Sequence, residues 1–413
     1  MINLRLSRLP FYYGWVIVAA GTLTILACLG FGRFALGMLL PSMAATLGLS
    51  YAQMGFISTG NFIGYLVAVF VSHMIVVRIG QRKTVFFSLL LVALTMVLLS
   101  RSRTFAGLLM LYVVTGVGSG AANVSMMSMV LAWFEKNNRG KAAGFISAGS
   151  GLAIIFTGFF IPFINRVNGA EGWRVSWFSL GLIVGLIALL CLIILRNRPS
   201  DLGLSLPCEN GIAAVPLTAE TPQKPFDMYR SGSIYHLSLI YFLFGYTYII
   251  YATFIVTTLV KERGLPETLA GNFWAMVGFL SLFSGPVFGS ISDKLGRRTG
   301  MVIAFSIQSL AYLLVASALP GMFLYLSILL YGLVAWSIPA IIAAAVGDYA
   351  GPEHAARALG FITLFFGLGQ ISGPAVAGIL AQHSGSFSSS FYMAAALTCA
   401  GALISAGLKN SRH

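Results

Sequence analysis

Twelve long apolar segments, separated by short polar breaks, make up most of the sequence. They lie near residues 13–43, 52–77, 84–100, 104–134, 142–165, 173–195, 235–260, 268–292, 299–319, 321–347, 356–381 and 387–408. A helix needs about 20 apolar residues to cross the hydrocarbon core of a bilayer. The pattern therefore predicts an all-α membrane protein with twelve transmembrane helices.

The composition agrees with a chain whose main solvent is lipid. Of its 413 residues, 58% are hydrophobic and 9% are charged. A net charge of +14 also fits a nucleic-acid-binding protein, but the Lys and Arg residues form short clusters between apolar segments. Such clusters are typical of loops beside membrane spans, so we expect no nucleic-acid partner. The first segment lacks a cleavage site and is too long for a signal peptide, which favours a transmembrane helix.

No feature of the sequence indicates an enzyme. The four cysteines, Cys28, Cys191, Cys208 and Cys399, have a spacing that suits neither a disulfide framework nor a zinc site. We interpret them as small apolar side chains. No motif for a catalytic nucleophile, a metal or a cofactor is visible. We therefore expect no metal, no cofactor and no catalytic residue.

The distribution of cations predicts how the chain crosses the membrane. If the N-terminus lies inside, eighteen of the 25 Lys and Arg residues fall in inner segments and six in outer segments, and Arg33 is the one left within a span. Since cytoplasmic loops carry an excess of Lys and Arg, we expect both termini in the cytoplasm.

The longest polar stretch, Arg196–Ser233, contains five prolines and divides the spans six and six. We interpret it as a cytoplasmic linker. The expected organisation is an N-terminal six-helix half over 1–195, a linker over 196–234 and a C-terminal six-helix half over 235–413.

A weak internal repeat relates the two halves at an offset of 216 residues. The aligned positions include Gly48 and Gly264, Gly55 and Gly271, Gly80 and Gly296, Arg82 and Arg298, and Gly-Phe-Ile runs at 144 and 360. The offset holds without gaps from the second span to the fifth. Parallel repeats related by an axis along the membrane normal occur in transporters, so we expect two pseudo-symmetric halves.

The loop after the eighth span, Gly289–Arg298, reads GSISDKLGRR. It resembles the G-x-x-x-D-[RK]-x-G-R-[RK] signature of the major facilitator superfamily of secondary transporters. The loop after the second span keeps Gly80 and Arg82 but has Val77 in place of the aspartate. The resemblance implies the major facilitator fold and alternating access.

A narrower resemblance is to the monocarboxylate transporter and oxalate/formate exchanger branch and to related uncharacterised bacterial transporters. The residues that carry it are YGW at Tyr13–Trp15, the run Gly116–Ala153 and GWR at Gly172–Arg174. Members of that branch usually use an arginine in the eighth span to hold the substrate carboxylate, but Thr268–Ser292 contains no cation. The resemblance also implies a bacterial inner (plasma) membrane.

The signature loops are expected to control the conformation. In the family, the loop acid holds the cytoplasmic ends of the two halves together while the transporter opens outward. We expect Asp293 to meet the start of the fifth span, where Arg139 and Lys141 lie, through charge and the helix dipole. The other expected gating residues are Gly289, Gly296, Arg297 and Arg298 in one loop and Gly80 and Arg82 in the other.

Arg33 is the best candidate for binding an anion. A charge within a membrane helix is costly and usually faces a cavity or a partner, and a guanidinium binds a carboxylate through two hydrogen bonds. No acid lies inside a span to pair with it. The alternatives are snorkelling to the outer headgroups and hydrogen bonding to carbonyls at a helix end.

Further candidates for substrate contact are polar and aromatic residues within the spans. They are Asn61, Tyr65, Asn123, Tyr246, Tyr248, Tyr251, Tyr331, Trp336 and Gln370. For each one, helix–helix packing is an equal alternative. As a set they are typical of an aromatic pocket with few polar groups.

Taken together, these features favour a secondary active or facilitative transporter for a small organic anion, a monocarboxylate or related carboxylate. Export of apolar or cationic compounds, with a structural Arg33, is the alternative, and a non-transporting sensor is a third. No acid within a span offers a proton relay, and Tyr112 replaces the arginine of the antiporter signature R-x-x-x-G. Exchange, facilitated flux or symport of a protonated substrate is therefore favoured. We expect a monomer in a lipid bilayer.

Overall fold

The computed structural model describes residues 12–204, 231–317 and 319–408, and within them every regular element is a helix. The helices are α1 (Gly14–Ile25), η2 (Leu26–Phe34), α2 (Ala35–Leu47), α3 (Tyr51–Ile79), α4 (Gln81–Arg101), α5 (Phe105–Trp133), α6 (Lys136–Asn168), η3 (Gly169–Glu171), α7 (Gly172–Ile194), η4 (Pro199–Leu202), α8 (Gly232–Thr257), η6 (Thr258–Glu262), α9 (Glu267–Leu295), α10 (Arg297–Ala316), α11 (Met322–Val334), α12 (Ser337–Ser384) and α13 (Ser388–Ala406).

The described helices account for twelve membrane crossings. Eleven helical runs are long and apolar enough to span a bilayer, and one of them, Asn138–Ile194, is 57 residues long and contains both α6 and α7. The first crossing joins α1, η2 and α2. Helix α12 contributes to two crossings because it breaks at Gly351, whose φ is 75°. The predicted all-α fold is confirmed, with bounds within a few residues of those expected.

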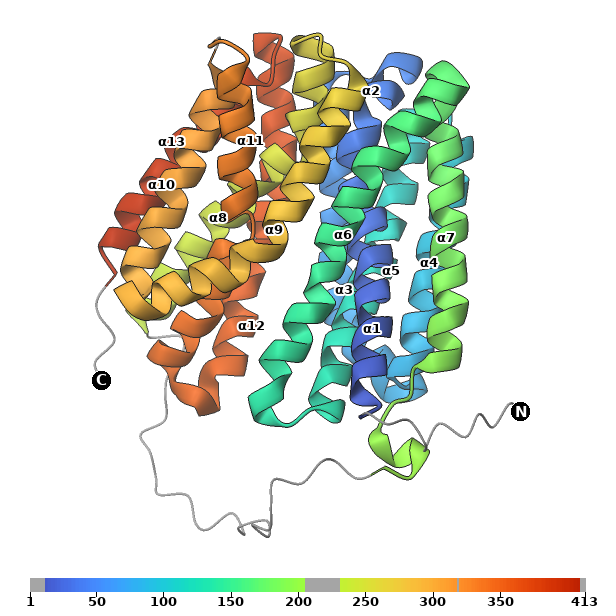
Figure 1. The fold of residues 1–413 in the computed structure, drawn as a ribbon, viewed down its shortest axis with the longest axis vertical. Coiled ribbons are helices and arrows are strands. Elements are labelled where there is room, and N and C mark those ends of the chain that lie inside the picture. Colours follow the sequence, from blue (N-terminus) through green and yellow to red (C-terminus); the bar gives the residue numbers. More distant parts are fainter. Residues whose placement is uncertain (1–11, 205–230, 318, 409–413) are drawn as a thin grey trace.

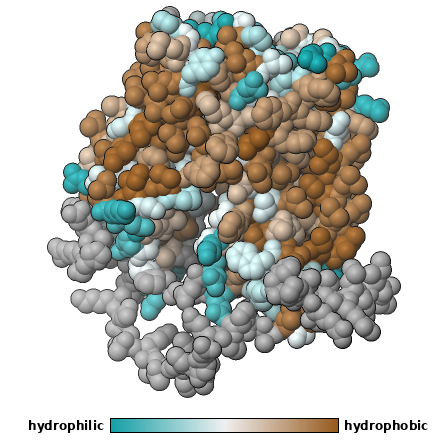
Figure 2. Space-filling view, in the orientation of Figure 1, coloured by the Kyte–Doolittle hydropathy of each residue, from teal (hydrophilic) through white to brown (hydrophobic). Residues whose placement is uncertain are grey.

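The outer surface suits a lipid environment. Hydrophobic residues cover the sides of the bundle, while hydrophilic ones gather towards its two ends (Figure 2). Large apolar side chains such as Phe70, Met110 and Leu403 are more than half exposed. A soluble protein rarely exposes so much contiguous apolar surface.

The helices form two groups side by side, α1 to α7 in blue to green and α8 to α13 in yellow to red (Figure 1). The backbone follows the 216-residue repeat. Gly48 and Gly264 have φ of 64° and 66°, and Gly80 and Gly296 have φ of 81° and 89°. A third pair at the same offset, Gly169 and Gly385, has φ of 65° and 79°. Because glycine adopts positive φ without steric cost, the repeated glycines place equivalent turns in both groups.

We call the end of the bundle where α7 ends and α8 begins the linker end, and the opposite end the far end. At the far end the two groups touch backbone to backbone. Gly55 of α3 lies against Pro374 of α12, and Gly271 of α9 lies against Gly158 of α6. The two contacts are related by the offset of 216. A Cβ on Gly55 or Gly271 would fall within 3.0 Å of a backbone oxygen, so a larger residue would push the groups apart.

At the linker end the two groups are separated. A Cβ on Gly144 of α6, Gly289 of α9 or Gly360 of α12 would meet no atom within 4 Å. The surface is hollowed between the groups at this end (Figure 2). The molecule is therefore closed at the far end and open at the linker end.

Candidate functional site

Arg33 lies in an irregular part of the first crossing. It is nineteen residues after Gly14 and fourteen before Leu47, within the π-helical stretch η2. Side chains of neighbouring helices satisfy the carbonyls of this stretch. Ser119 donates to Cys28 O at 2.7 Å, Asn61 Nδ2 to Gly32 O at 3.4 Å, and Tyr112 OH to Arg33 O at 2.9 Å. Irregular backbone within a membrane needs such partners, and π-helical turns are frequent at functional sites.

Two glycines on either side of Phe31 allow this stretch to pack closely. A Cβ on Gly30 would collide with the side chain of Ala153, and one on Gly32 would lie 2.9 Å from Ser119 Oγ. The glycines therefore let α6 and α5 approach the backbone that carries Arg33.

The guanidinium of Arg33 is held by neutral groups of α3. Its Nε donates to Asn61 Oδ1 at 3.2 Å. Its Cζ lies 4.5 Å from the ring centroid of Phe62 and 4.3 Å from that of Tyr65, which gives two cation–π contacts. Asn123 Nδ2 donates to Tyr65 OH at 2.6 Å and so orients the second ring.

The charge of Arg33 has no acidic partner in the part of the chain that the structure describes. The ion pairs found there join Arg174 to Glu171, and Arg297 to Asp293 and Asp348. Arg33 is only 8% exposed, and its Nη2 is buried without a hydrogen-bond partner. A buried donor without a partner costs about 1–3 kcal/mol, and more when the group is charged. The arrangement can therefore accept an anion.

A small cavity lies between the two groups. Its polar and aromatic lining consists of Phe34, Tyr248, Trp274, Ser281, Tyr331 and Trp336, and aliphatic side chains complete it. The space open to the centre of a water molecule is about 10 Å³, close to the least that one buried water needs. In this conformation the cavity is nearly closed around its lining.

Tyr248 connects the cavity to Arg33. The Tyr248 hydroxyl interacts electrostatically with the guanidinium and accepts a hydrogen bond from Gln370 Nε2. The rings of Tyr248 and Phe34 each lie 5.7 Å from that of Trp336. The cation of the first group and the aromatic cavity of the second are thus parts of one site.

Most of the predicted substrate-contact residues meet at this site. Arg33, Asn61, Tyr65, Asn123, Tyr248 and Gln370 form one hydrogen-bonded and aromatic cluster, and Tyr331 and Trp336 line the cavity beside it. Two predicted residues lie elsewhere. Tyr246 OH contacts Met393 Sδ at 3.7 Å, and Tyr251 OH lies 3.0 Å from Ser327 Oγ. Both hydroxyls are engaged inside the second group, so we leave these residues out of the site.

The structure adds polar and aromatic residues that the sequence did not single out as site residues. They are Phe34, Phe62, Tyr112, Trp274 and Ser281. The available signal for Phe62 was its spacing from Tyr65, because residues three apart share a helix face. Tyr112 stood out only as a departure from an antiporter signature. Trp274 gave no signal in an apolar span.

The predicted gating residues are engaged within their own groups in this conformation. Arg297 pairs with Asp293 and donates from Nε to Asp348 Oδ2 at 2.8 Å. Arg139 instead donates to the carbonyls of Phe134 and Leu131. Because the linker end is open here, a contact between Asp293 and Arg139 belongs to the opposite conformation and stays a prediction.

The other residues of the signature loops are at helix ends. Arg82 donates from Nε to Leu192 O at 2.8 Å, which ties the start of α4 to α7. Lys141 and Arg298 are exposed. Gly80 and Gly296 supply the turns of positive φ before α4 and α10.

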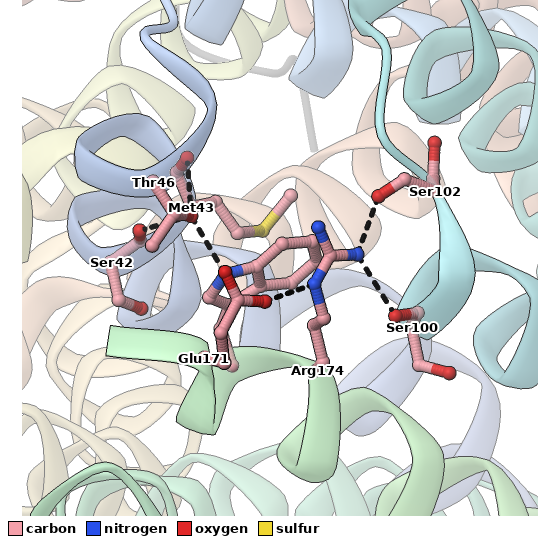
Figure 3. A network of polar contacts seen from close by, with 8 residues as sticks. Ser42, Met43, Thr46, Ser100, Ser102, Glu171 and Arg174 are labelled. Atoms are coloured by element: carbon pink, nitrogen blue, oxygen red, sulfur yellow. Dashed lines mark hydrogen bonds and ion pairs between the residues drawn. The ribbon is translucent and has the colours of Figure 1, made fainter. Parts of the chain in front are cut away.

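The GWR motif joins helices at the far end of the first group. Arg174 pairs with Glu171 and donates from Nη1 to the carbonyls of Ser100 and Ser102 (Figure 3). Trp173 Nε1 donates to Thr46 Oγ1 at 2.8 Å. The motif therefore fixes the start of α7 against α4 and α2.

Two pseudo-symmetric groups of helices, packed around a central cavity that is closed at one end, define a secondary transporter of the major facilitator type. The chain belongs to the family described as "Uncharacterised MFS-type transporter YbfB", whose model matches residues 25–406. The predicted superfamily is thereby confirmed, and the protein is a transporter rather than an enzyme.

Curated relatives and solved structures agree with this assignment. The chain is 26% identical over 396 residues to a hexuronate transporter of Bacillus subtilis (strain 168), covering 88% of this chain and 87% of the relative. It is 25% identical over 280 residues to the oxalate:formate antiporter of Oxalobacter formigenes, covering 67% and 63%. The fold matches a D-xylose-proton symporter with a TM-score of 0.77 at 16% identity, over 97% and 98% of the two chains.

Proposed function

We propose that this transporter carries a small organic anion across the membrane and that Arg33 binds its carboxylate. The observation that supports this most directly is the buried guanidinium whose Nη2 has no partner. A carboxylate oxygen at that atom forms a charge-assisted hydrogen bond, which is roughly twice as strong as a neutral one. The substrate thus supplies the counter-charge that the described helices lack.

The contacts around Arg33 suit an anion anchor better than a structural role. Asn61 uses its amide hydrogens on two backbone carbonyls, Gly32 O and Tyr112 O, so its Oδ1 is directed to Arg33 Nε. The rings of Phe62 and Tyr65 hold the guanidinium without neutralising it. The site therefore orients the cation and leaves its charge available.

The relatives support an anionic substrate. The hexuronate transporter and the oxalate:formate antiporter are both named for carboxylates. We take the shared chemistry to be the carboxylate group and not the rest of either molecule.

We further propose that the linker end faces the cytoplasm of a bacterial cell and that transport follows alternating access. The excess of Lys and Arg at the linker end supports this orientation. The conformation described above is then inward-open, and the paired contacts at Gly55 and Gly271 form the closed outer gate. Every described acid lies at a helix end or break, which favours exchange, facilitated flux or symport of a protonated substrate over a proton relay within the protein.

A binding screen tests the anion anchor. The purified protein is heated with carboxylates, neutral sugars and organic cations, since a ligand that binds the folded state raises the melting temperature. We expect carboxylates alone to stabilise the protein. The Arg33→Gln variant should bind them about 10- to 100-fold more weakly, because a hydrogen bond to a charged group is worth about 1.5–3 kcal/mol.

A matched control separates this effect from loss of charge in general. Arg78 is exposed at the linker end of α3, and the Arg78→Gln variant should bind carboxylates as the natural protein does. Stabilisation by carboxylates that survives at full strength in Arg33→Gln contradicts the proposal, as does a screen in which only cations stabilise the protein.

A further inference from the structure

We infer that the substrate is a monocarboxylate whose remaining part, its body, is compact and mainly aromatic or apolar. We also infer that Trp274 donates a hydrogen bond to one acceptor on that body. The inference rests on the proposed anion anchor at Arg33. It goes beyond it by assigning the lining of the cavity beside Arg33 to the part of the substrate that is not the carboxylate. Since the cavity has only about 10 Å³ of open space in this conformation, the lining must move apart when that part binds.

The lining of the cavity favours a flat apolar body. The rings of Phe34, Tyr248, Tyr331 and Trp336 surround it. They come from both groups of helices, and the separation of 5.7 Å between the rings of Phe34 and Trp336 joins the two groups directly. Aromatic walls bind flat apolar ligands through ring contacts and burial of apolar area.

Two hydroxyl protons of the lining are already used. Tyr331 OH donates its proton to Tyr248 O at 2.9 Å, and Ser281 Oγ donates to Gly278 O at 2.7 Å. Tyr248 OH accepts a hydrogen bond from the amide of Gln370, which leaves its own proton available. Tyr331 and Ser281 therefore have no proton left to donate to a ligand.

Trp274 carries a donor that is fully buried and unpaired. Its side chain is 1% exposed and lines the cavity, and its Nε1 is buried with no hydrogen-bond partner in the described residues. An indole N–H can only donate, and a buried tryptophan usually finds a partner for it. A substrate acceptor such as an ether, ester or carbonyl oxygen would satisfy this donor.

This inventory argues against a sugar acid as the substrate. A hexuronate carries several hydroxyl groups, and each one that is buried without a partner loses free energy relative to water. Sites that bind polyhydroxylated ligands must supply matching polar groups. Besides Arg33, the lining offers as donors the indole N–H groups of Trp274 and Trp336 and the hydroxyl proton of Tyr248. These are fewer than the hydroxyl groups of a hexuronate, so the lining suits the substrate named in the hexuronate-transporter relative poorly.

The test compares ligands that share the carboxylate and differ in the body. Calorimetric titration of the purified full-length protein in lipid nanodiscs gives the Kd of benzoate, of glucuronate, and of methoxybenzoates and ethylbenzoates substituted at the same ring positions. We expect benzoate to bind at least tenfold more tightly than glucuronate. At one ring position the methoxybenzoate should bind about fivefold more tightly than the ethylbenzoate, since they differ by one acceptor of similar size.

A variant tests the role of Trp274. Trp274→Phe keeps the aromatic wall and removes the donor, so the preference for methoxybenzoate over ethylbenzoate should disappear while benzoate affinity changes less than twofold. Trp15→Phe, at a partly exposed position outside the cavity, should keep the preference. A preference that persists in Trp274→Phe overturns the role of Trp274.

The outcomes separate this inference from the proposed function. Glucuronate that binds as tightly as benzoate, with both ligands lost in Arg33→Gln, overturns the inference and leaves the anion anchor standing. Carboxylate binding that is unchanged in Arg33→Gln, or no binding of any carboxylate, overturns the anchor and the inference together.

Discussion

Replacement of Gly271 by alanine tests whether the glycine contacts at the far end set the conformation. The Cβ of Gly271→Ala would fall within 3.0 Å of the backbone oxygen of Gly158 in the opposite group. Backbone cannot rotate away as a side chain can, so α9 and α6 must separate. Gly55→Ala meets Pro374 O in the same way at the symmetric contact.

The size of the effect follows from the cost of overpacking. Inserting a methyl group where none fits costs about 1–3 kcal/mol. The penalty applies only when the far end is closed, so it lowers the ratio of closed to open far ends by about 5- to 150-fold. We expect a large population of molecules with an open far end.

Distances between spin labels measure this shift. Arg103 and Met322 are exposed at the far end of the two groups, and labelled cysteines at these positions, in a background without reactive native cysteines, report their separation. Gly271→Ala and Gly55→Ala should add a longer distance to the distribution. Gly185→Ala is the control, because its Cβ would meet Ala93 at an ordinary 3.7 Å. Identical distributions for all three variants and the natural protein would refute the reasoning.

Three further predictions concern single side chains. Tyr112→Phe leaves Arg33 O without its donor and should lower the free energy of unfolding by about 1–3 kcal/mol. The measurement is the melting temperature, and an unchanged melting temperature would contradict a stabilising role of the hydroxyl. Arg174→Gln loses two hydrogen bonds to backbone carbonyls at the far end and should lower the free energy of unfolding by about 1.5–3 kcal/mol. The affinity for carboxylates should not change, and an altered affinity would contradict a purely structural role. Asp293→Asn should shift the protein towards the conformation open at the linker end, because it weakens the predicted contact of Asp293 with Arg139 that closes that end. If the accessibility of cysteines at each end is the same in the variant as in the natural protein, that contact is refuted.

The crossings could be predicted because they depend on local sequence. A run of about 20 apolar residues has few alternatives to a membrane helix, and glycines such as Gly48 and Gly80 recur where the backbone needs positive φ. Arg33 could be singled out for a similar reason, since a lone cation within a span is rare whatever surrounds it.

The irregular backbone at Arg33 could not be predicted in this way. The stretch Leu26–Phe34 is apolar and rich in glycine, and nothing in its own residues distinguishes a π-helix from an α-helix. Its geometry depends on donors that come from α3 and α5, namely Asn61, Tyr112 and Ser119. These contacts are far apart in sequence.

No local signal separates the tyrosines of the seventh span, for a different physical reason. In the most apolar part of Gly232–Glu262, 89% of the residues are buried inside the bundle, so no polar or exposed stripe reveals which face borders the cavity. Tyr248 faces the cavity, while Tyr246 and Tyr251 face neighbouring helices of their own group. Only the packing of α8 distinguishes them.

The uncompensated charge of Arg33 has a consequence for how voltage acts on the transporter. With a monocarboxylate bound as proposed, the site is electrically neutral, whereas the empty site carries one positive charge. A membrane potential acts on a charge with about 2.3 kcal/mol per 100 mV. Reorientation of the loaded protein then moves no net charge at this site, but the return of the empty protein does. A membrane potential that is negative inside therefore favours the inward-open form of the empty protein. The voltage dependence of transport then arises in the step in which the empty protein reorients.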